Sequence, residues 1–284
     1  MRQLVLVLGA GGQLGGAMAE GLAVRHEVVA RARAELDVTD AVAVRAAVTA
    51  ICPDVIVNCA AWTDVDGAEA QPAAALAANA WAVREMARLA GELDATLVHY
   101  STDFVFDGET GRPYAEDDAP NPRGAYAASK LLGEWFAAEV PRHYVLRVES
   151  LFGGPRAKSS IDRLLDGLRA GAEVRAFGDR VVSPTFVDDA VAATDRLLAR
   201  TAPPGLYHCV NTGCATWFDV ARELASALDV SNARIVPIAQ ADLPLRAPRP
   251  LFAALSNDKL RRAAGDMPTW QDAVRRYVHA RVMR

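Results

Sequence analysis

Two periodicities alternate along the first 150 residues of this chain. Short runs rich in Val, Ile and Leu predict strands, which we place at residues 3–8, 27–30, 54–58, 96–101 and 144–148. Between them, apolar residues recur every three or four positions and predict helices with one buried face, as at Leu14, Met18 and Leu22. This alternation predicts an α/β fold with a doubly wound parallel sheet, a Rossmann fold.

The alternation becomes less regular after about residue 150. Glycine and proline clusters at 153–155, 203–205 and 244–250 interrupt shorter elements. We therefore predict a Rossmann domain over residues 1–150 and a smaller C-terminal lobe, mainly for substrate binding, over 151–284. Within that lobe, residues 187–211 look regular enough to return to the Rossmann domain.

Composition argues against nucleic-acid and membrane partners. The 284 residues carry a formal charge of −4 and a pI near 5.8, with arginines scattered among acids, so nucleic acid is not an expected partner. No apolar run approaches the ~18 residues of a membrane span, and Met1 and Arg2 lead directly into the first strand, so we expect a cytoplasmic protein and no membrane partner. The cysteines contain no CxxC pair and are predicted to be reduced, buried thiols rather than metal ligands: Cys52, Cys59, Cys209 and Cys214.

Three glycines follow the first predicted strand at the spacing GxxGxxG: Gly9, Gly12 and Gly15. A diphosphate must approach backbone N–H groups at a helix N-terminus there, and a side chain would obstruct it. Because this turn joins an apolar strand to a periodic helix, it predicts a dinucleotide site.

The end of the second strand indicates which dinucleotide binds. Arg31 and Arg33 precede the first acids, Glu35 and Asp37, and an arginine can pair with the 2′-phosphate of NADPH. We therefore predict NADPH, with NADH as the alternative. Asp37 is assigned either to the adenine end of the cofactor or to the cap of the next helix.

Tyr126 and Lys130 are four residues apart in a segment with helical periodicity, so they should share one helical face. An ammonium about 4 Å from a phenol, at an effective dielectric of ~20, stabilises the phenolate by up to about 4 kcal/mol. That equals roughly three pKa units and predicts a tyrosine whose pKa is lowered toward neutrality for general acid catalysis. Thr102, at the end of a predicted strand, can donate to the same carbonyl oxygen.

Longer motifs carry a resemblance that runs through most of the chain. They are NCAAWTDVDGAE at 58–69, STDFVFDG at 101–108, SPT at 183–185, GLYH at 205–208, TW at 216–217, RP at 249–250 and PTW at 268–270. In this order they resemble the extended short-chain dehydrogenase/reductases, and within them the dTDP-4-dehydrorhamnose reductase family. Phe104 separates the chain from the related sugar-nucleotide dehydratases, which have a second acid at that position.

The resemblance implies reduction of the C4 keto group of dTDP-6-deoxy-L-lyxo-4-hexulose to dTDP-L-rhamnose. It implies a nucleotide-sugar partner, leaves a homodimer open, and makes Thr102, Tyr126 and Lys130 catalytic. With the glycine turn and the arginines, the implied cofactor residues are Gly9, Gly12, Gln13, Leu14, Gly15, Arg31, Arg33, Asp37, Ala60, Ala61, Asn79, Tyr126 and Lys130. The implied substrate residues are Thr102, Asp103, Phe104, Glu149, Ser150 and Arg249.

Two segments depart from the family pattern. The family reads RTxWVYG where residues 147–153 read RVESLFG, so Ser150 replaces a tryptophan, and DQxGxPT where residues 179–185 read DRVVSPT. Gly16 and Ala17 stand where some members carry an acid that holds Mg²⁺, so a metal is not favoured. Two alternatives therefore stay open: a reductase or epimerase acting on another nucleotide sugar, and a non-catalytic NADP-binding regulatory subunit resembling the methionine adenosyltransferase beta subunit.

Overall fold

The computed structural model describes residues 2–156 and 158–282. Its centre is a parallel sheet with the strand order β10-β5-β4-β3-β1-β2. The strands are β1 (Leu4–Leu8), β2 (Glu27–Arg31), β3 (Val55–Asn58), β4 (Thr96–Thr102), β5 (His143–Val148) and β10 (Gly205–His208). The prediction of a doubly wound α/β fold is confirmed, with the first five strands within one residue of their predicted bounds.

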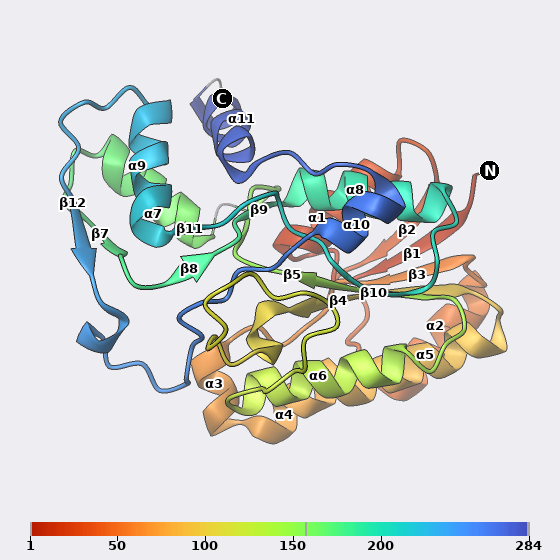
Figure 1. The fold of residues 1–284 in the computed structure, drawn as a ribbon. Coiled ribbons are helices and arrows are strands. Elements are labelled where there is room, and N and C mark those ends of the chain that lie inside the picture. Colours follow the sequence, from red (N-terminus) through yellow and green to blue (C-terminus); the bar gives the residue numbers. More distant parts are fainter. Residues whose placement is uncertain (1, 157, 283–284) are drawn as a thin grey trace.

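Helices cover both faces of the sheet (Figure 1). On one face lie α1 (Gln13–Leu22), α8 (Val187–Ala199) and α10 (Asp258–Ala264). On the other lie α2 (Ala41–Ile51), α3 (Val65–Ala70), α4 (Pro72–Leu76), the π-helical turn η1 (Ala77–Trp81), α5 (Ala82–Glu92) and α6 (Ala125–Ala137). A 3-10 turn, η2 (Asp103–Val105), directly follows β4.

Alternating residues of β1 explain why both faces need a helical layer. Val5 and Val7 belong to the core beneath α1 and α8, whereas Leu6 and Leu8 belong to the core against α2 and α5. All four side chains are fully buried. A strand that is apolar on both faces is stable only between two layers, so this run requires the three-layer arrangement.

The chain beyond β5 forms smaller elements beside the carboxyl ends of the sheet (Figure 1). Its helices are α7 (Ser160–Arg169), α9 (Trp217–Ala227), the 3-10 turn η3 (Gln240–Asp242) and α11 (Trp270–Val282). Its short strands pair as β6 (Leu151–Phe152) with β9 (Thr185–Phe186), β7 (Val174–Phe177) with β12 (Ile235–Ile238), and β8 (Val181–Val182) with β11 (Ala215–Thr216). A domain boundary at residue 150 stays a prediction.

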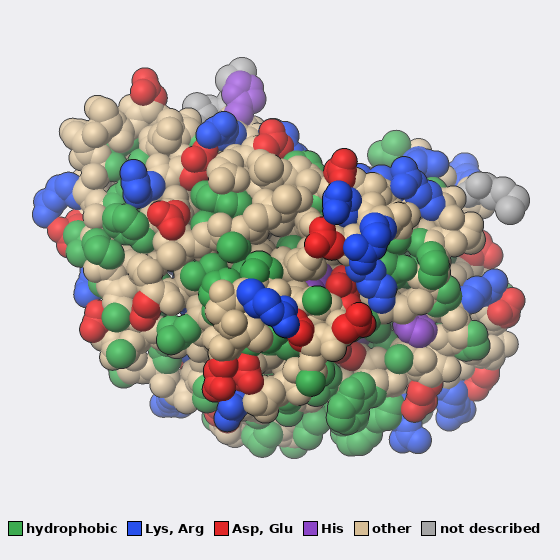
Figure 2. Space-filling model, viewed as in Figure 1, with side chains coloured by type: hydrophobic (Ala, Val, Ile, Leu, Met, Phe, Trp, Pro, Cys, Tyr) green, Lys and Arg blue, Asp and Glu red, His purple; other side chains and the backbone are tan. Residues whose placement is uncertain are grey.

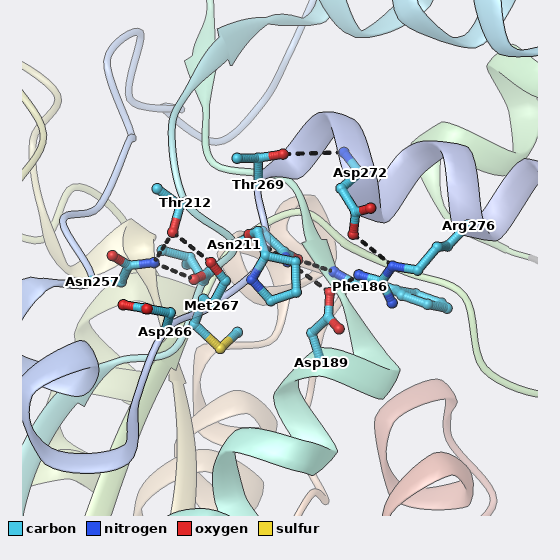
Figure 3. A network of polar contacts seen from close by, with 12 residues as sticks. Phe186, Asp189, Asn211, Thr212, Asn257, Asp266, Met267, Thr269, Asp272 and Arg276 are labelled. Carbon is cyan, nitrogen blue, oxygen red and sulfur yellow. Dashed lines mark hydrogen bonds and ion pairs between the residues drawn. The ribbon is translucent and has the colours of Figure 1, made fainter.

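A polar network connects α8, α11 and the segment after β10 (Figure 3). Asn211 accepts from the backbone N–H of Phe186 at 2.8 Å and donates to Asp189 at 2.7 Å. Arg276 of α11 donates to the same Asp189, at 2.7 Å, and to Asp272. Buried amides and carboxylates are stable only when paired, so this network fixes how the C-terminal helix packs on the sheet domain.

The predicted burial of the cysteines is wrong at two positions. All four thiols are free, and Cys209 is buried, but Cys52 and Cys214 are exposed and Cys59 is half-buried. Cys52 ends α2 in a left-handed conformation, with φ of 50°, and Cys214 lies in the loop before β11. Both positions are turns at the surface, where local apolar character in the sequence does not produce burial.

The surface viewed in Figure 2 intermixes acidic and basic side chains. Among the described residues, no helix has the length and hydropathy needed to cross a bilayer.

Candidate active site

A cleft of about 930 Å³ opens at the carboxyl ends of the strands. It lies where β1 is paired with β2 on one side and β3 on the other, so that successive connections diverge. Open α/β sheets bind ligands at such a switch point. Residues from the β1–α1 turn, the ends of β2, β3, β4 and β5, and the first turns of α6 line the cleft.

The glycine turn packs so closely against neighbouring backbone that two of its positions leave no room for a side chain. Gly9 has φ of 78°, and a Cβ there would lie 2.6 Å from the backbone nitrogen of Ala60. A Cβ at Gly15 would collide with Gly9 O and lie 2.7 Å from its carbonyl carbon. The N-cap of α1 is Gly12, without a side-chain cap, so its first N–H groups are free for a diphosphate. These residues fit a dinucleotide. Leu14 also lines the cleft, as does Gln13, whose amide donates to Gly153 O at 2.9 Å.

The part of the cleft that follows β2 contains Arg33 and Asp37, whose side chains pair at 3.2 Å. Hydrogen bonds from Thr39, and then Arg33, lower the pKa of Asp37. Arg31 does not line the cleft, and its guanidinium donates to Ala30 O. Asp40, not Asp37, caps α2.

Ala60 and Ala61 line the cleft after β3, but Asn79 does not. Asn79 is fully buried, accepts from the backbone N–H of Trp62 at 2.8 Å and donates to Ser129 Oγ at 2.9 Å. Its contacts hold the segment after β3 against α6.

The three residues implied for catalysis meet in this cleft. Thr102 ends β4, and Tyr126 and Lys130 lie on one face of α6. Thr102 donates to Asp103 Oδ1 at 2.8 Å, and Lys130 Nζ donates to Tyr100 O at 2.6 Å.

The predicted electrostatic effect of Lys130 on Tyr126 is wrong for this arrangement. Burial raises the pKa of Tyr126 well above 10, and the neighbouring Thr102 hydroxyl opposes that rise. Burial also lowers the pKa of Lys130 to about 8. The ammonium points to a main-chain carbonyl, so desolvation determines the acidity of the phenol.

Of the remaining residues implied for the substrate, Asp103, Phe104 and Ser150 line the cleft, and Glu149 and Arg249 do not. The Phe104 ring stands edge-on to Tyr126, with centroids 5.5 Å apart. Glu149 is buried behind the cleft wall and accepts from the backbone N–H of Ser183 at 2.5 Å. Arg249 binds both oxygens of Asp66, at 3.1 and 2.8 Å, which lowers the pKa of that carboxyl.

Sequence reasoning did not assign a role to Arg180. Arg180, in the turn between β7 and β8, lies 5.7 Å from the centroid of the Phe104 ring. Arg156 lines the cleft beside the glycine turn. The signal for Arg180 was its position in the segment that departs from the family pattern. Among the described residues, no cluster of three His, Cys, Asp or Glu side chains could hold a metal ion.

Comparison with known proteins adds independent findings. A family model described as the RmlD substrate binding domain matches residues 1–283. The dTDP-4-dehydrorhamnose reductase of Streptomyces griseus is 39% identical over 284 residues, covering 95% of this chain and 91% of the relative. A probable dTDP-4,6-dihydroxy-2-methyloxan-3-one 4-ketoreductase of Streptomyces antibioticus is 37% identical over 277 residues, covering 95% and 92%.

The solved structures agree with this relationship. The dTDP-4-dehydrorhamnose reductase of Bacillus anthracis, in complex with NADP, has a TM-score of 0.93 at 29% identity, covering 99% of this chain and 100% of that chain. The Clostridium acetobutylicum ortholog has a TM-score of 0.93 at 30% identity, with the same coverage. The chain therefore belongs to the RmlD substrate-binding domain family, the family of the dTDP-4-dehydrorhamnose reductases.

Proposed function

We propose that this chain is an oxidoreductase that uses NADPH to reduce the C4 keto group of dTDP-6-deoxy-L-lyxo-4-hexulose, giving dTDP-L-rhamnose. One observation carries the proposal: a single cleft combines a glycine turn that fits a dinucleotide with Thr102, Tyr126 and Lys130. The names of the relatives, at 39% and 35% identity, support the same reaction.

NADPH, when bound, supplies the hydride. Thr102 and Tyr126 bind the carbonyl oxygen of the sugar, and Tyr126 gives it a proton. Because its pKa is raised, the phenol carries that proton at neutral pH. We assign Lys130 to the cofactor ribose.

We propose that the free backbone N–H groups at the start of α1, from Gln13 on, bind the diphosphate of the cofactor. Gly9, Gly12 and Gly15 shape the turn that presents these groups, and the N–H groups of Gly9 and Gly12 bond to Arg31 O and Gly9 O within it. Arg33, rather than Arg31, is assigned to the 2′-phosphate, because only Arg33 lines the cleft. Its ion pair with Asp37 is exposed and therefore weak, so a phosphate can replace the carboxylate as its partner. Asp103, Phe104 and Ser150 are assigned to the sugar.

The test is incubation of the purified protein with NADPH and this ketosugar, generated in situ by its upstream dehydratase and epimerase, with chromatographic detection of dTDP-rhamnose. Tyr126→Phe is the matched control. Failure of a folded, NADPH-binding protein to turn over the ketosugar would refute the proposal and leave two alternatives, another ketosugar as substrate and the regulatory subunit.

A second candidate is reduction of another dTDP-linked 4-keto sugar. It is favoured by Ser150 at the cleft wall, where the family pattern has a tryptophan, and by the 37% identity to the Streptomyces antibioticus ketoreductase. A 2-deoxy ketosugar offered in the same assay tests it. Faster turnover of the 2-deoxy substrate would favour this second candidate.

We also propose that the chain forms a homodimer and acts in the cytoplasm. Trp81 and Trp135, which are 50% and 62% exposed, lie on η1 and α6, two helical segments that contact each other. Exposed indoles often mark protein contact surfaces, which supports association. Size-exclusion chromatography with light scattering, comparing wild type with Trp135→Gln, tests it.

A further inference from the structure

The hydroxyl group of Thr102 has one hydrogen and two lone pairs. The backbone N–H of Phe104 donates to it at 3.2 Å, and Thr102 donates its own hydrogen to Asp103 Oδ1 at 2.8 Å. A hydrogen donated to Asp103 is not available to the carbonyl oxygen of a substrate. The role proposed for Thr102 therefore depends on the protonation of Asp103.

Asp103 lies in an unusual group of buried charges. It is 3% exposed, and its Oδ2 has no hydrogen-bond partner among the described residues. Glu149, at the end of β5, is 2% exposed, and its Oε1 is also unpartnered in the described part of the chain. One cation, Arg180, faces both carboxyl groups, and its Nε too has no partner in the described ranges. Two buried carboxyls beside a single cation disfavour a state in which both are ionised.

We propose that Asp103 acts as a neutral carboxylic acid that donates its O–H to Thr102, so that the Thr102 hydrogen turns to the substrate's carbonyl oxygen. This inference rests on the proposed function. The hydroxyl oxygen then accepts from Phe104 N–H and from Asp103, which fills both lone pairs, and its hydrogen is free for the ligand.

The chemical step balances without a proton from Asp103. Hydride adds to the carbonyl carbon, the π pair of the C=O bond becomes a lone pair on oxygen, and Tyr126 transfers its proton to that oxygen. Thr102 and Asp103 keep their hydrogens throughout. Asp103 is thus a positioning residue that acts through Thr102.

The proposal determines how the rate depends on pH. Burial raises the pKa of Asp103 to about 6, and Arg180 opposes that rise. The other groups facing this cluster are Tyr126 toward Asp103, Cys214 toward Glu149, and Arg249 toward Arg180. The neutral form exists below the pKa, so kcat/KM should fall as pH rises through about 6.

The decisive experiment compares pH profiles of kcat/KM for the ketosugar. Wild type should lose activity by about tenfold per pH unit above its midpoint, as for one ionisation. Asp103→Asn offers an amide donor to Thr102 at every pH and should abolish this decline. Arg180→Gln removes the cation that favours ionised Asp103 and should move the midpoint to higher pH.

Arg175→Gln on β7 is the control, since it removes an exposed arginine of the same lobe and should leave the midpoint unchanged. An unchanged profile in Asp103→Asn, or a midpoint in Arg180→Gln that stays or moves to lower pH, overturns the proposal.

An infrared titration separates this inference from the proposed function, because it requires neither ketosugar nor NADPH. The carboxylic acid C=O band of wild type should disappear with a midpoint near 6, and this component should be missing in Asp103→Asn. A band that is unchanged in Asp103→Asn refutes the inference even if the ketosugar is reduced. Absence of turnover with the expected band refutes the proposed function instead.

Discussion

Gly15→Ala tests whether the glycine turn is required by geometry rather than by helix formation. Inside α1, alanine should stabilise the helix by about 1 kcal/mol relative to glycine. The new Cβ would, however, collide with Gly9 O and lie 2.7 Å from Gly9 C and 3.0 Å from Ala10 Cα, all of them main-chain atoms. Such overpacking costs about 1–3 kcal/mol, so the collision outweighs the helix gain.

Gly15→Ala should change NADPH affinity more than it changes the free energy of unfolding. Displacing the turn moves the N–H groups assigned to the diphosphate, and a loss of about 1.4–2.8 kcal/mol raises the Kd for NADPH by about 10- to 100-fold. Urea unfolding and fluorescence titration with NADPH measure the two effects. Gly91→Ala in α5 is the control, because its Cβ meets nothing within 4 Å and should be neutral or stabilising. Wild-type NADPH affinity in Gly15→Ala would refute the reasoning.

Three further predictions concern the same cleft. Tyr126→Phe should lower the hydride-transfer rate by about 10²- to 10⁴-fold with NADPH affinity nearly unchanged, and full activity in a stopped-flow assay would assign the proton to another group. Burial lowers the pKa of Lys130 to about 8, so its ammonium is lost as pH rises through that value. NADPH affinity measured by calorimetry should therefore fall around pH 8 in wild type and show no such fall in Lys130→Ala. Arg33→Ala should weaken NADPH binding about tenfold more than NADH binding, while Arg31→Ala should change the two affinities equally. Equal losses of affinity for NADPH and NADH in Arg33→Ala would contradict the assignment.

The fold and the cofactor half of the cleft were predictable because their signals are local. β1, the glycine turn and α1 follow one another in the sequence, and the collision distances at Gly9 and Gly15 show why no side chain fits there. The YxxxK spacing likewise places Tyr126 and Lys130 on one face of a single helix, α6. Each of these depends on residues within one or two turns of one another.

The contacts that decide finer roles join distant segments and could not be predicted in this way. Arg31 and Arg33 are two residues apart, yet Arg33 lines the cleft and Arg31 does not, because β2 ends at Arg31 and Arg33 lies in the turn that follows. Asn79, implied as a cofactor residue, instead binds Trp62 and Ser129. Neither outcome has a local signature in the sequence.

The pKa values of the buried groups were the property that the sequence predicted least well. The spacing of Tyr126 and Lys130 predicted a phenol acidified by an ammonium, but burial raises the pKa of that phenol, and the amine is directed to Tyr100 O. Burial likewise raises the pKa of Asp103, because the end of β4 is enclosed between the sheet and the turn that carries Arg180. A buried phenol that keeps its proton needs a second donor to polarise the carbonyl before that proton is transferred, and Thr102 is free to be that donor only when Asp103 is neutral. Burial therefore has two effects: it makes Tyr126 a weaker acid, and by keeping Asp103 neutral it leaves the Thr102 hydrogen free for the carbonyl oxygen.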